Sequence, residues 1–207
     1  SGHRRRAVSR PRLSRLGMSA RFILARREIA KRVASLLLGV LAAAFATRSV
    51  AEPSAVKLEA VNAVDRHAAA LTELSDRIWA YAEIAFREHR SAAALAEFAQ
   101  SQGFRVERGV AGMPTAFVAT YGQGRPVIGV MGEYDALPGL SQKALPEQVP
   151  LAEGAAGHGC GHNLFGAASL GAAIAIKEQL EAGRLQGTVV FFGTPAEEDV
   201  GGKIYMA

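Results

Sequence analysis

Two stretches between residues 57 and 103 carry apolar side chains at the spacing of amphipathic helices. In residues 57–86 the apolar positions recur every three or four residues, and they are Leu58, Val61, Val64, Leu71, Leu74, Ile78, Tyr81 and Ile84. This period places them on one face of a helix. A second helix is predicted over residues 90–102, and Gly103 ends it because glycine readily closes helices.

Two continuous apolar runs predict strands further along the chain. They cover residues 116–121 and 126–131, and the sequence Gly-Gln-Gly-Arg between them predicts a turn. The simplest interpretation is a β-hairpin. Residues 140–157 contain Pro146 and Pro150 and predict a loop.

The last third of the chain predicts one more helix and one more strand. Small and apolar residues over 163–181 predict a tightly packed helix with Asn163 as its N-cap. The sequence GTVVFFG at 187–193 predicts a strand buried on both faces. The order of elements predicts an α/β fold with a mixed, mostly parallel sheet covered by helices. The chain ends within what should be a further helix, and we interpret it as a fragment.

The basic residues of the chain are concentrated at its N-terminus. Residues 1–32 hold 11 of the 24 lysines and arginines but one of the 19 acidic residues, which leaves 13 basic and 18 acidic residues after position 32. A mildly acidic body gives no support for a phosphate-binding surface. We therefore expect no nucleic-acid partner.

Residues 18–51 have the three-part layout of a secretory signal peptide. A basic stretch precedes an apolar run over 33–46, and Ser-Val-Ala at 49–51 offers a cleavage site. The apolar run is shorter than the roughly 20 residues of a membrane-spanning helix. We expect an extension plus signal peptide over residues 1–51, export to a bacterial periplasm, and no stable membrane insertion after cleavage. The alternative is an uncleaved amphipathic or anchoring helix.

Three groups of reactive side chains stand where predicted elements begin or end. They are Glu133 and Asp135 after one strand, His158, Cys160 and His162 before a helix, and Glu197, Glu198 and Asp199 after another strand. Sites in open α/β sheets form outside the carboxyl ends of strands, and helix N-termini favour negative ligands. We therefore expect these groups to lie close together.

The only cysteine, Cys160, cannot form an internal disulfide and instead indicates metal binding. Cys160 and His162 are two residues apart in a glycine-rich loop, so in extended backbone both side chains point the same way. A thiolate with an imidazole suits a borderline-soft cation such as zinc. The alternatives are a buried inert cysteine, or a nucleophilic thiol with His158 or His162 as its base.

The adjacent carboxylates Glu197 and Glu198 can point in different directions and do different work. One can bind a metal while the other transfers protons, because their neighbours separate their pKa values. Asp135 can accept a hydrogen bond from a metal-binding imidazole, or it can form a turn before Pro138. Asp199 is interpreted as a solvated neighbour.

The sequences GEYDALPG, GHGCGHN and GTPAEE, in this order, resemble the aminoacylase/carboxypeptidase metallohydrolases of peptidase family M-20. The most similar branch comprises the amidohydrolases that include aminobenzoyl-glutamate hydrolase and the hippurate and auxin-conjugate hydrolases. The resemblance covers about residues 58–207. It implies a zinc-peptidase-like catalytic domain, of which residues 52–207 would be the N-terminal part, without the dimerisation domain and the C-terminal part.

The same resemblance assigns roles to single residues. Cys160, His162 and Glu198 match metal ligands, Glu197 matches the general base, and Asp135 matches the aspartate that supports the site. His158 and Glu133 are candidates for lining the site.

The resemblance also implies an activity. It is the hydrolysis of the amide bond in N-acyl or N-aroyl amino acids such as aminobenzoyl-glutamate, or in dipeptides, with one or two Zn or Mn ions. The full-length form would be a homodimer or a hetero-oligomer that acts on small molecules. Family members have further histidine ligands beyond the equivalent of residue 207, so the alternative is a truncated, non-catalytic metal-binding fragment.

Overall fold

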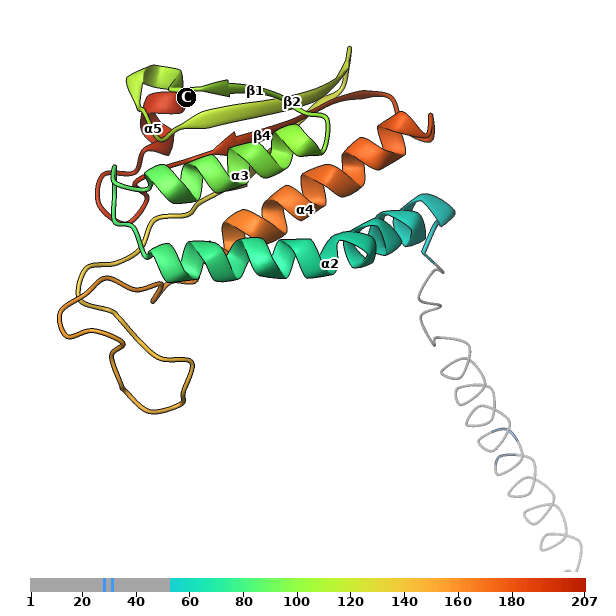
Figure 1. The fold of residues 1–207 in the computed structure, drawn as a ribbon. Coiled ribbons are helices and arrows are strands. Elements are labelled where there is room, and N and C mark those ends of the chain that lie inside the picture. Colours follow the sequence, from blue (N-terminus) through green and yellow to red (C-terminus); the bar gives the residue numbers. More distant parts are fainter. Residues whose placement is uncertain (1–27, 29–30, 32–52) are drawn as a thin grey trace, which may run out of the picture. The chain divides into compact units, whose positions relative to one another are not determined.

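The computed structural model describes residues 28, 31 and 53–207. The predicted signal peptide therefore lies outside the described residues. Residues Pro53–Ala207 form one compact unit (Figure 1). Among the described residues, no helix has both the length and the apolar character needed to cross a membrane.

Three long helices follow the hydrophobic pattern, with shifted ends. They are α2 (Ala55–Tyr81), α3 (His89–Ser101) and α4 (His162–Glu181). Helix α2 ends before the predicted residue 86 because Ala82 takes a left-handed conformation, with φ of 45°. The N-cap of α4 is Gly161 rather than Asn163, which lies inside the helix and donates from Nδ2 to Ser75 Oγ at 3.1 Å.

Four strands form one sheet in the order β1-β2-β4-β3. Their bounds are Arg105–Arg108 for β1, Phe117–Gln123 for β2, Val127–Gly132 for β3 and Gly187–Gly193 for β4. A short 3-10 helix, η1 (Val110–Gly112), and a helix near the end of the chain, α5 (Lys203–Met206), complete the elements of residues 53–207. The prediction of an α/β fold with a mixed sheet is confirmed, but "mostly parallel" is wrong here, because only β3 and β4 pair in parallel.

The predicted hairpin of β2 and β3 is also wrong, because β4 lies between these two strands. β4 runs antiparallel to β2 and parallel to β3. The turn before β3 makes room for the start of β4, since Gly187 has no side chain to clash with the carbonyl oxygen of Pro126. The most apolar strand thus takes the central position, where its neighbours bury it.

Helices α3 and α4 pack on one face of the sheet, and α2 packs along α4 (Figure 1). The side chains of Val189 and Phe191 on β4 are buried beneath these helices. Val190 and Phe192 alternate with them and are half-buried on the opposite face, so the prediction of a strand fully buried on both faces is wrong. The alternation marks the helix-covered face as the site of the core.

Glycine at one helical position brings α4 close to the end of β3. A Cβ at Gly166 would collide with the carbonyl oxygen of Glu133. This close approach sets the first turn of α4, with His162, beside the residues that follow β3.

Candidate functional site

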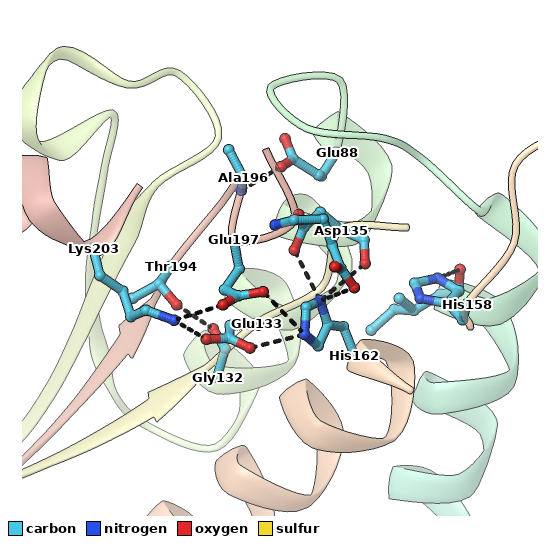
Figure 2. Close-up of polar contacts among 12 residues, drawn as sticks. Glu88, Gly132, Glu133, Asp135, His158, His162, Thr194, Ala196, Glu197 and Lys203 are labelled. Carbon is cyan, nitrogen blue, oxygen red and sulfur yellow. Dashed lines mark hydrogen bonds and ion pairs between the residues drawn. The ribbon is translucent and has the colours of Figure 1, made fainter. Parts of the chain in front are cut away.

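The site lies where the parallel strands β3 and β4 end and where α4 begins (Figure 2). Thr194 ties the two strand ends together, because its backbone N–H donates to the carbonyl of Gly132 at 2.9 Å. The carboxylates after both strands therefore face the same imidazole. The structure brings together Glu133, Asp135, Cys160, His162, Glu197 and Glu198. Their assigned roles as ligands and catalytic groups stay predictions.

His162 stands at the centre of the site, and its side chain is 5% exposed. Its Nδ1 lies 3.0 Å from Asp135 Oδ1 and 3.1 Å from the Asp135 carbonyl oxygen. Its Nε2 lies 2.9 Å from Glu133 Oε2. Burial alone would lower the pKa of His162, but the hydrogen bond and charge of Asp135, with Glu133 beyond, hold it above its ordinary value.

Asp135 connects two segments that are far apart in the chain. Its side chain is fully buried. While Oδ1 faces His162, Oδ2 accepts the backbone N–H of Glu198 at 2.8 Å. The same carboxylate therefore orients the imidazole and fixes the loop that follows β4.

The two adjacent glutamates lie on different sides of the imidazole, as their separate predicted roles require. Glu197 Oε2 is 3.8 Å from His162 Nε2, and Glu198 Oε1 is 3.7 Å from His162 Nδ1. Glu197 is the more exposed of the two, with 37% of its side chain accessible against 16% for Glu198. A substrate in solution can therefore reach Glu197 more easily than Glu198.

Two overlapping groups of side chains could hold cations, and both include His162. One is Cys160, His162 and Glu198, and the other is Glu133, His162 and Glu197, with ligand atoms in each group within 4.8 Å of one another. Glu198 Oε1 is buried and has no hydrogen-bond partner among the described residues. Such an orphaned carboxylate oxygen next to a thiol and an imidazole is a natural ligand for a cation.

Cys160 is exposed at the edge of the site. The negative charge of Glu198 raises the pKa of its thiol above the ordinary value. A free thiol that is harder to ionise is a weaker nucleophile at neutral pH. The surroundings of Cys160 therefore do not activate it as the thiol nucleophile that the sequence left open.

His158 points away from the carboxylates (Figure 2). Its Nε2 lies 3.0 Å from the carbonyl oxygen of Ile78 in α2, and burial lowers its pKa. We therefore interpret His158 as a residue that packs the loop before α4 against α2. Asp199 is exposed, as expected.

Two charged residues of the site were missed in the sequence. Lys203 Nζ pairs with Glu133 Oε1 and lies 3.8 Å from Glu197 Oε1. Glu88 is fully buried, and its Oε1 accepts the backbone N–H of Ala196 at 2.7 Å. Burial, with the charge of Asp135 adding to it, raises the pKa of Glu88. The only signal for Lys203 was its position five residues after Glu198, and Glu88 stands in a charged stretch that looks solvated.

Comparisons with known proteins agree with the family that the three motifs indicate. Residues 129–207 match peptidase family M20/M25/M40. The chain is 49% identical over 136 residues to one of the subunits of p-aminobenzoyl-glutamate hydrolase from Escherichia coli, covering 65% of this chain and 28% of that protein. It is 35% identical over 170 residues to the mouse Xaa-Arg dipeptidase, covering 76% of this chain and 36% of the dipeptidase. The chain thus spans about a third of the length of these relatives.

A solved structure shows a similar fold. The YXEP protein of Bacillus subtilis, described as a dinuclear metal binding peptidase from the M20 family, matches 63% of this chain and 35% of its own. The TM-score is 0.54 at 26% sequence identity. The resemblance drawn from the three motifs is therefore confirmed, and the part of the chain that carries the site belongs to peptidase family M20/M25/M40.

Proposed function

We propose that the full-length protein is a metal-dependent amidohydrolase that cleaves the amide bond of N-acyl or N-aroyl amino acids. The observation that carries this proposal is the buried imidazole of His162, which is shared by two groups of candidate ligands. Buried charges of this density cost stability unless a bound cation compensates them. This supports a metal site over a structural ion pair.

The residues present fit a divalent cation of the zinc type. Cys160, His162 and Glu198 would hold it with sulfur, nitrogen and oxygen ligands, the set that zinc prefers. Glu133 and Glu197 lie on the other side of His162 and offer oxygen ligands that manganese would also accept. A second cation there would replace the ammonium of Lys203 as the partner of these carboxylates. When bound, such a cation lowers the pKa of water and polarises an amide carbonyl.

The protein's own residues would handle protons and orientation. Glu197 would take the proton from the attacking water and pass it to the leaving amine, because it is the most exposed of the carboxylates beside His162. Asp135 would keep the imidazole oriented through Nδ1. Lys203 would limit the repulsion between Glu133 and Glu197, since its ammonium lies between their oxygens.

The substrate proposal draws on the relatives. The relative that is 49% identical is named for the hydrolysis of p-aminobenzoyl-glutamate, which supports this compound as the first candidate. The 35% identity to an Xaa-Arg dipeptidase supports basic dipeptides as the second. Because the first relative is named as one of several subunits, it supports a hetero-oligomer over a homodimer for the full-length form. We also propose that the protein is exported, on the sequence pattern of residues 18–51.

The test uses full-length protein, expressed from its complete reading frame and stripped of metal by a chelator. Zn or Mn is added back, and hydrolysis of p-aminobenzoyl-glutamate and of Xaa-Arg dipeptides is followed. We expect hydrolysis to disappear on chelation and to return with metal. Hydrolysis that survives complete metal removal would falsify the proposal, and covalent labelling of Cys160 during turnover would favour the thiol mechanism instead. For the 207-residue chain by itself, a melting temperature that added metal leaves unchanged would favour the alternative of a non-catalytic fragment.

A further inference from the structure

The residue directly before the proposed general base has a backbone conformation that alanine disfavours. Ala196 is fully buried and has φ of 56°, in the left-handed region. This region is costly for a residue with a Cβ atom. Such a conformation persists only where neighbouring groups hold it.

Hydrogen bonds hold Ala196 on both sides. Its N–H donates to Glu88 Oε1 at 2.7 Å, and its carbonyl oxygen accepts the N–H of Gly201 at 2.9 Å. Two residues later, Asp135 holds the N–H of Glu198 at 2.8 Å. Two buried carboxylates, Glu88 and Asp135, thus fix the peptide groups on either side of Glu197 (Figure 2).

Glu88 is not needed to cap helix α3, because Glu83 already performs this role. Glu88 occupies the N-cap position of α3, but its side chain makes no capping hydrogen bond. Glu83 does this work, because its carboxylate accepts the N–H groups of Arg90 at 3.2 Å and Ser91 at 2.9 Å. The second oxygen of Glu88, Oε2, is buried without a partner among the described residues. The bond to Ala196 is therefore the contact that links the Glu88 carboxyl group to the loop after β4.

We propose that Glu88 is a positioning residue for Glu197: by holding the N–H of Ala196 it fixes the left-handed turn that aims the Glu197 carboxylate at the reacting water. This inference rests on the proposed function, in which Glu197 is the general base. Glu88 lies behind the loop, on the side of Ala196 away from Lys203 in Figure 2, and acts through the backbone alone.

A matched pair of variants separates this role from a packing role. Glu88→Met fills the same space without a strong acceptor, whereas Glu88→Gln keeps an oxygen where Oε1 lies. The amide of Gln has nearly the same shape as the carboxyl group and keeps a hydrogen-bond acceptor for the N–H of Ala196. In the metal-loaded full-length protein we expect Glu88→Met to lower kcat about 100-fold, the effect of misplacing a catalytic group by about 1 Å. KM should stay within about threefold, and Glu88→Gln should restore kcat to within about fivefold of the wild type.

Glu178→Ala is the control variant, because it also removes a carboxylate that links two elements of the fold but does so away from the site. Glu178 in α4 pairs with Arg66 at 2.6 Å and with His67 at 2.8 Å in α2, away from the site. This variant should lower the melting temperature without changing kcat.

An independent measurement is hydrogen–deuterium exchange in a peptide covering residues 194–200. Exchange in this peptide should be faster in Glu88→Met than in the wild type, but unchanged in Glu88→Gln and Glu178→Ala.

The outcomes separate this inference from the proposed function. An active wild type whose kcat is unchanged by Glu88→Met, or lowered equally by Met and Gln, overturns the positioning role. If the wild type hydrolyses no amide, the proposed function fails, and exchange at residues 194–200 alone decides whether Glu88 holds the turn. Equal exchange in the wild type and in Glu88→Met then overturns the inference.

Discussion

The two ends of strands β3 and β4 differ in whether their charged and polar side chains are buried or exposed. At the carboxyl ends, Glu88 and Asp135 are buried to 1% exposure or less. At the opposite end, residues 122–126 and 183–186 are all exposed. That end also has a cavity of about 680 Å³, lined by polar side chains such as Gln123 and Arg125.

The contrast shows that buried charge, rather than hollow volume, marks the site in this molecule. Desolvating a carboxylate is costly, so a group of buried carboxylates around one imidazole needs compensation by hydrogen bonds, opposite charges or a bound cation, and such groups are candidates for functional sites. Exposed glutamines and arginines carry no such cost and need no explanation. Variants at each end of the strands test this contrast.

The largest effect is expected from Glu197, the proposed general base. Glu197→Gln keeps the shape of the side chain but cannot accept a proton, so kcat should fall about 10³-fold. The melting temperature should hold or rise, because one of the mutually repelling carboxylates is gone. Both values can be measured on the metal-loaded full-length protein. A kcat within tenfold of the wild type would remove Glu197 from this role.

A smaller loss of activity is expected from the residue that supports the imidazole. Asp135→Asn keeps one oxygen acceptor and replaces the other oxygen with an NH2 group. That NH2 group must face either the N–H of Glu198 or Nδ1 of His162, so one of the two hydrogen bonds is lost. We expect a loss of about 10- to 100-fold in metal affinity or activity, the usual effect of removing a partner behind a ligand. Metal titration followed by zinc analysis measures the affinity. Unchanged metal binding and kcat would show that Asp135 forms a turn and nothing more.

The sequence predicted which side chains come together better than it predicted the order of the strands, and the reason is physical. Glu133, His162 and Glu197 each stand at the end of an element, so the parallel pairing of β3 and β4 is enough to bring them together. The position of β4 between β2 and β3 depends on pairing between strands that are far apart in the chain. Local patterns favour neighbours in sequence and therefore indicated a hairpin.

The burial of Glu88 and the backbone conformation of Ala196 could not be predicted from local sequence patterns. Nothing in the stretch around Glu88 distinguishes a buried acceptor from a solvated helix-start residue, because its partner is 108 positions away. The left-handed φ of Ala196 was equally hidden, since glycine is the usual signal for that conformation. Lys203 meets Glu133 only after the chain turns back at Gly201 and Gly202.

A moderate effect on stability is expected from Glu83, which caps α3 near the site but outside it. Burial alone would raise its pKa, but hydrogen bonds from Ser91 and Arg90 hold the pKa below the ordinary value of 4.5. Removing the cap in Glu83→Ala should lower the free energy of unfolding by about 1 kcal/mol at neutral pH.

The pH dependence of Glu83 has a definite sign. Because the folded state lowers its pKa, its contribution is complete above pH 4.5 and is lost as the pH falls through the lowered value. The difference in unfolding free energy between the wild type and Glu83→Ala should therefore narrow below pH 4.5. Urea unfolding at several pH values measures this difference. A gap that stays constant down to about pH 3 would mean that Glu83 stabilises α3 through packing instead of charge.

The smallest effect is expected from variants at the opposite end of the sheet. These variants test directly whether buried charge marks a functional site in this molecule and an open cavity does not. Gln123 and Gln186 line the cavity there, and both are exposed. Replacing both with alanine should change the free energy of unfolding by no more than about 0.5 kcal/mol per site, as for ordinary surface positions. Metal content, kcat and KM should all stay at wild-type values. A clear rise in KM for the amide substrate would mean that this cavity binds part of the substrate, and exposed polar volume would then count as evidence of a site alongside buried charge.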